Sequence, residues 1–112
     1  MVVEVGQWVV TRDDNVFWDF KVWDRQDDWA CVKTVETETN TMGVCGDYLV
    51  TGGFGLIKLW ETANWTCVRT LEGHTDVVTD FAMLGTRLLS CSWDISTVVV
   101  ETVGAAALVP II

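Results

Sequence analysis

The sequence is poor in the residues from which metal centres and cofactor sites are built. It has one histidine, His74, and four cysteines, Cys31, Cys45, Cys67 and Cys91, with no Cys-x-x-Cys pair among them. Zinc sites use closely spaced cysteine and histidine ligands, and no such spacing is present in this sequence. We therefore expect no metal and no cofactor, and we expect reduced cysteines that are buried as small apolar side chains.

Basic residues are also scarce. Seven lysine and arginine residues stand against sixteen acidic residues, which gives a formal net charge of -9. Proteins bind a nucleic-acid backbone through lysine and arginine side chains that neutralise phosphates, so we expect no nucleic-acid partner. The acidity would attract a basic protein segment, and it would also keep the protein soluble; composition leaves both interpretations open.

No apolar run is long enough to cross a membrane. The largely apolar tail covers only residues 103–112, whereas a helix that spans a bilayer needs about 20 residues. The amino terminus lacks a basic region followed by an apolar core, so no signal peptide is predicted. We expect a protein of the cytoplasm or nucleus that has no membrane partner.

What the chain does contain is a repeat of about forty residues. Small hydroxyl residues follow three turn glycines at a constant interval, and successive landmarks lie 40 and 39 positions apart: Gly6 with Thr11, Gly46 with Thr51, and Gly85 with Ser90. The third apolar run of each period ends at Trp23, Trp60 and Val100, and residues 16–19 are an insertion in the first period. Such a period indicates repeated supersecondary units.

Each period predicts four short β-strands. The apolar runs are rich in valine and aromatic residues and are separated by glycine and polar turns. The predicted strands are 2–5, 8–12, 20–23 and 30–35, then 39–44, 48–52, 56–60 and 66–71, then 77–83, 87–92 and 97–101, with the tail 103–112 left open. No segment has a sustained helical period, so the predicted fold class is all-β and antiparallel.

Three stretches carry a resemblance to a known family: residues 57–62, residues 67–74 with Gly73-His74 at their end, and residues 88–94 with Ser92-Trp93-Asp94 at their end. They resemble the WD-repeat β-propeller family. The resemblance implies one WD-repeat region, 1–112, made of antiparallel four-stranded blades at about 1–36, 37–73 and 74–112. The Cys-Val-Arg-Thr-Leu run at residues 67–71 is most similar to the WD-repeats of F-box-type substrate receptors.

Three blades do not make a closed propeller, because a ring takes about four to eight blades. The terminal blades would each leave a face uncovered. Two interpretations follow: a homo-oligomer that completes a propeller, or a fragment of a longer protein. The tail lacks the polar pattern of an outer strand, which favours truncation.

One set of residues is typical of catalysis. Ser90, His74 and Asp94 could place an imidazole between a hydroxyl and a carboxylate, as in activated nucleophiles. The resemblance implies instead that these residues form a structural hydrogen-bond network, which a third-strand tryptophan completes. The corresponding residues of the other two units are Thr51, Trp60, Thr11 and Trp23. We expect a protein that is not an enzyme, and a small hydrolase using Ser90 and His74 remains the third alternative.

A candidate binding surface lies at the turns between second and third strands. Phe54, Trp93 and Asp14 precede the turn residue there, and the resemblance implies that this face contacts partner peptides. Aromatic residues and arginine are enriched in binding hot spots, which adds Arg12, and Asp76 and Thr39 stand near first-strand starts on the same face. Trp8, Trp23 and Trp60 lie on strands and are expected to pack in the core. The predicted function is a scaffold that binds other proteins or peptides; the alternative is a truncated or decayed fragment without independent function.

Overall fold

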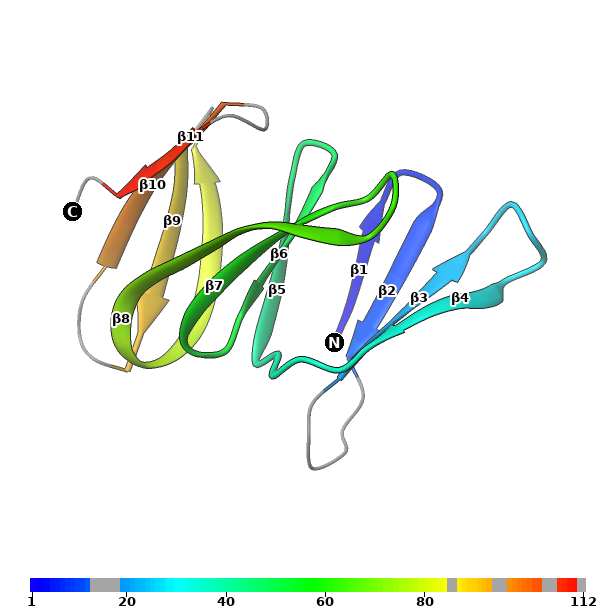
Figure 1. The fold of residues 1–112 in the computed structure, drawn as a ribbon, viewed down its shortest axis with the longest axis horizontal. Coiled ribbons are helices and arrows are strands. Elements are labelled where there is room, and N and C mark those ends of the chain that lie inside the picture. The colour runs from blue at the N-terminus through cyan, green and yellow to red at the C-terminus, as the bar shows by residue number, and fades with distance from the viewer. Residues whose placement is uncertain (13–18, 85–86, 94–96, 104–106, 111–112) are drawn as a thin grey trace.

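The computed structural model describes residues 1–12, 19–84, 87–93, 97–103 and 107–110. These residues form eleven β-strands, and no helix occurs among them (Figure 1). Within the same ranges, no helix is long and apolar enough to span a membrane. The predicted all-β class is confirmed.

All neighbouring strands run antiparallel, in two hydrogen-bonded sheets. A four-stranded sheet has the order β1-β2-β3-β4, and a seven-stranded sheet has the order β11-β10-β9-β8-β7-β6-β5. The strands are β1 Val2–Val5, β2 Trp8–Arg12, β3 Phe20–Asp24, β4 Ala30–Val35, β5 Thr41–Cys45, β6 Tyr48–Gly52, β7 Phe54–Glu61, β8 Thr66–Leu84, β9 Arg87–Ser92, β10 Thr97–Val103 and β11 Ala107–Pro110. Nine of these elements, β1–β7, β9 and β10, each lie where the sequence predicted one strand, and the tail forms β11.

The exception is β8, because two separate strands were predicted there. β8 runs through the Gly73-His74 pair, and Figure 1 shows it as one long curved ribbon. Its pairing with β7 jumps from Leu56–Glu72 to Phe54–Val77, and the ribbon doubles back there so that its last part pairs with β9. β8 therefore belongs to two four-stranded units. We call β1–β4 the first unit; β5–β7 with residues 66–72 the second; and residues 78–84 with β9–β11 the third.

The second unit is packed on both of its faces. Because side chains alternate along a strand, Leu49 faces one neighbour and Val50 faces the other, and both are fully buried. One core cluster joins the second unit to the first: Val5, Val10, Phe20, Val22, Met42, Leu49, Trp60 and Trp65. The other joins it to the third: Cys45, Val50, Ile57, Leu59, Val78 and Leu88.

Hydrogen bonds from side chains to backbone carbonyls connect the three units at one end. Arg12 Nη1 donates to the Asn40 carbonyl at 2.7 Å, and Asn40 Nδ2 donates to the Val78 carbonyl at 2.8 Å. Gly53 is required at this end, since a Cβ there would lie 2.5 Å from the Glu38 carbonyl oxygen. These contacts hold the connections between units in fixed positions.

The outer face of the first unit has no neighbour among the described residues. Residues on this outer face are equivalent in the repeat to residues of the second unit, and those residues of the second unit are buried against the first unit. Val2 is 67% exposed where Met42 is 8%, and Trp29 is 56% exposed where Trp65 is 6%. Each tryptophan lies just before an outer strand, and each has a positive φ, 61° for Trp29 and 56° for Trp65. At these two positions the first unit thus exposes side chains that the second unit buries, whereas Val9, the equivalent of Leu49, is buried in the first unit as well.

Candidate protein-interaction surface

Two exposed aromatic side chains lie at the end of the units where β6 meets β7 and β9 ends. Phe54 is 60% exposed and Trp93 is 69% exposed. They flank the same residue: Phe54 pairs with Val77 across the sheet, and the Trp93 amide donates to the Val77 carbonyl at 3.1 Å. Two strand spacings put their backbones about 10 Å apart. The structure therefore brings these two sequence-predicted residues together.

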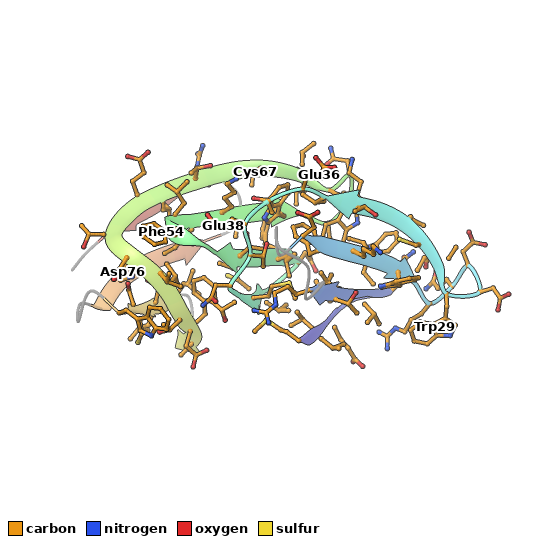
Figure 2. The ribbon with its side chains drawn as sticks, turned by 90° about the horizontal axis from the view of Figure 1, so that it is seen from below. Trp29, Glu36, Glu38, Phe54, Cys67 and Asp76 are labelled. Carbon is orange, nitrogen blue, oxygen red and sulfur yellow. The ribbon has the colours of Figure 1, made fainter. Side chains whose placement is uncertain are left out.

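Acidic residues border the two aromatics. Figure 2 looks onto this end and shows Phe54, Glu38 and Asp76 on the same side of it. Asp76 is half-buried and its Oδ1 accepts a hydrogen bond from the Val77 amide at 2.7 Å, whereas Glu38 is exposed. This surface, Phe54, Trp93, Glu38 and Asp76, combines apolar area with negative charge.

A small cavity of about 120 Å³ opens beside Phe54. It is lined by Thr37, Glu38, Thr51, Gly53, Phe54, Leu56 and Lys58. Lys58 Nζ donates to Thr37 Oγ1 at 3.0 Å. The lining thus holds one positive side chain, Lys58, and one negative side chain, Glu38. A hollow of this size accommodates a small side chain of a partner rather than a ligand the size of a cofactor.

The other predicted contact residues are placed differently. Arg12 is half-buried and its guanidinium binds the Asn40 carbonyl within the chain. Thr39 is fully buried, so its prediction as a contact residue is wrong; its hydroxyl donates to the Thr37 carbonyl. Asp14 lies outside the described residues.

The predicted network residues meet in three pairs. Trp60 Nε1 donates to Thr51 Oγ1 at 2.9 Å, and Trp23 Nε1 donates to Thr11 Oγ1 at 2.9 Å. His74 Nε2 lies 2.9 Å from Ser90 Oγ, and Asp94 is outside the described residues. Ser90 is fully buried and His74 is 7% exposed, which places both polar groups in the packed interior and not on a cleft. Buried polar groups need such partners, so each pair fixes the second strand of its unit to a neighbouring strand.

The two tryptophan pairs predict unequal losses of stability. Trp60→Phe removes the indole donor from Thr51, which is 2% exposed, and should cost about 1–3 kcal/mol of unfolding free energy because a buried hydroxyl loses its partner. Trp23→Phe should cost less, since Trp23 and Thr11 are half-buried on the outer face and water can replace the indole. Urea unfolding followed by circular dichroism measures both variants, and equal losses would contradict this explanation.

Two features were missed or mispredicted from the sequence. Trp65 is a core residue whose ring meets Trp8 edge-to-face at 6.0 Å and 81°. Its place before an outer strand, like that of Trp29, was the sequence signal that could have identified it.

Cys45 is buried as expected, but Cys31, Cys67 and Cys91 are exposed, so that part of the prediction is wrong. Cys31 and Cys67 lie on outer strands, where the Sγ atoms contact the Lys33 and Arg69 carbonyls. No group of three metal-ligating side chains occurs in the described part of the chain.

Comparisons with known proteins support the fold more than the function. No family model matches the chain. The pre-mRNA-splicing factor cwf17 of Schizosaccharomyces pombe is 37% identical over 85 residues, covering 70% of this chain, and the chain spans about a quarter, 24%, of that protein's length. Among solved structures, the computationally designed Ika4 protein superposes with a TM-score of 0.78 at 20% identity, over 96% of this chain and 68% of that one. The designed Ika8 protein gives 0.71 at 18% identity, over 91% and 32%. The chain therefore shares the fold of parts of these designed proteins.

Proposed function

We propose that this chain is a non-enzymatic interaction scaffold, made of WD-repeat propeller blades, that binds partner proteins or peptides through the surface of Phe54 and Trp93. The observation that carries the proposal is that Phe54 and Trp93 are both exposed on either side of Val77. They lie at the end of the sheets where hydrogen bonds connect the three units. Exposed aromatics on a rigid scaffold give a partner large apolar contact area at a low entropic cost. Glu38 and Asp76 favour a partner segment that carries basic residues.

The blade assignment rests on the repeated units. The turn glycines Gly6 and Gly46 share a φ of 59°, and the Trp23–Thr11 and Trp60–Thr51 bonds recur at the same place in successive units. The chain spans 24% of the splicing factor that it resembles, and we propose that it is a repeat region of a longer protein. In such a protein a further unit would cover the outer face of the first unit; for the chain alone, a second copy would take that place.

A second candidate is a fragment that has no function apart from a longer chain. It is favoured by the 24% share of the relative that the chain spans and by the uncovered outer face. The two candidates differ in what the Phe54 surface does: a scaffold retains specific binding there, and an inert fragment does not.

The proposed surface is tested by crosslinking and substitution. A photo-crosslinking amino acid at position 54 or 93 should capture a defined partner, which purified protein then binds directly. Phe54→Ala and Trp93→Ala should each weaken that binding by about tenfold or more, as expected for hot-spot aromatics. Val32→Ala is the control, because Val32 is 45% exposed but lies on the outer strand β4. Binding that Phe54→Ala and Trp93→Ala leave unchanged would overturn the assignment.

A further inference from the structure

A second cleft opens at the opposite end of the strands, between the first and second units. It has a volume of about 460 Å³. Its lining comes from the turns β1–β2 and β5–β6 and from the end of β7: Gln7, Trp8, Asp47, Tyr48, Glu61, Thr62 and Ala63. Because β7 runs from Phe54 to Glu61, this cleft is separate from the Phe54 surface.

The two aromatic walls of the cleft are held by different parts of the core. Trp8 packs against the cluster between the first and second units, where its ring meets Trp65 edge-to-face. Tyr48 packs against the cluster between the second and third units. Both side chains are half-buried. Aromatic side chains attract cations, and Trp8 and Tyr48 both line this cleft.

In the part of the chain that the structure describes, no basic side chain is paired with the two carboxylates of the cleft, Asp47 and Glu61. Among the described residues, Asp47 and Glu61 form no ion pair and their side chains accept no hydrogen bond, and none of the lining residues is basic. Arg25, in the neighbouring β3–β4 turn, binds the Gly6 carbonyl and lies 3.7 Å from Glu4. Two uncompensated negative groups thus border one opening.

A hydrogen bond between two side chains of the first unit has no counterpart at the equivalent positions of the second unit. In the first unit, Gln7 Nε2 donates to Asp24 Oδ1 at 3.2 Å, and the backbone N–H of Gln26 donates to the same oxygen at 2.9 Å. The equivalents of Gln7 and Asp24 are Asp47 and Glu61, which follow the second turn glycine and the second network tryptophan. An ionised aspartate cannot donate a hydrogen bond. The first unit satisfies its acid internally, whereas the second presents two acceptors to an external donor.

We infer that this cleft binds a cationic side chain, an ammonium or guanidinium group on a basic segment of a partner protein. The charged head donates hydrogen bonds to Asp47 and Glu61, and its aliphatic stem lies against Trp8 and Tyr48. A divalent metal fits less well, because no third His, Cys, Asp or Glu joins the two carboxylates among the described residues. The inference does not depend on the Phe54 surface.

Tyr48 provides a direct probe, since it is the single tyrosine of the chain. Fluorotyrosine incorporated in place of tyrosine gives one fluorine NMR resonance from the cleft. The protein is titrated with acetyl-Gly-Lys-Gly-amide, acetyl-Gly-Arg-Gly-amide and acetyl-Gly-norleucine-Gly-amide. Saturable shifts with the lysine or arginine peptide, and none with norleucine, are the expected result; the two cationic peptides tell ammonium from guanidinium.

Substitutions then assign the shift to the carboxylates. Asp47→Gln copies the first unit and should weaken peptide binding by about tenfold, through the loss of a charge-assisted hydrogen bond, without lowering the urea midpoint. Glu61→Gln should weaken it similarly. Glu38→Gln and Phe54→Ala, at the other end, should leave it unchanged. The inference is overturned if norleucine shifts the resonance equally, if Asp47→Gln and Glu61→Gln bind as well as the unsubstituted protein, or if calcium chloride saturates the site and excludes the lysine peptide.

Discussion

Phe20→Ala should lower the free energy of unfolding by about 3–5 kcal/mol. Phe20 is fully buried between the first and second units, and its ring meets Trp60 edge-to-face at 5.3 Å and 80°. Truncation removes apolar contacts from both units at once and leaves a cavity that rigid sheets cannot close. Small domains have about 5–15 kcal/mol of stability, so this loss is a large part of the total.

Phe54→Ala is the matched control, because it makes the same chemical change at a residue that is 60% exposed. Its effect should stay within about 0.5 kcal/mol. Urea unfolding followed by circular dichroism compares the midpoints and slopes of the two variants. If Phe20→Ala were as mild as Phe54→Ala, the face-to-face packing of the first two units would be wrong.

Val2→Glu should prevent self-association of the chain. Val2 is exposed on the outer face of the first unit, at the position where Met42 of the second unit is buried. We expect the outer face to be covered by a second copy in the same way, and a glutamate buried there without a partner should weaken association by about 100-fold or more. Val32→Glu, on outer strand β4, adds the same charge elsewhere and should leave association intact.

The strand positions could be predicted because the repeat fixes them locally. Alternating valines and aromatics mark each strand, and the glycine turns at Gly6 and Gly46 keep one phase. At β8 the sequence predicted two strands, and the structure has one continuous strand that doubles back between the two predicted segments. Pairing of Phe54 with Val77 continues the strand through that bend, and this long-range contact has no local signal.

The candidate sites were predictable in different degrees. Phe54 and Trp93 were identified from their position beside turns, but their common neighbour Val77 follows from strand pairing alone. The exposed cysteines Cys31 and Cys67 were mispredicted because apolar character does not reveal which strand lies outermost. The cleft between Trp8 and Glu61 arises from sheet-on-sheet packing, so no stretch of sequence contains it.

Repeated antiparallel units stack face to face through equivalent sets of residues, and no described residue covers the outer face of the first unit. Light scattering on the size-fractionated chain, over a range of concentrations, tests this stacking most directly. We expect a discrete oligomer with sharp thermal unfolding, which Val2→Glu converts to monomer and Val32→Glu does not. A disordered monomer, or a polydisperse aggregate that Val2→Glu leaves unchanged, would contradict it.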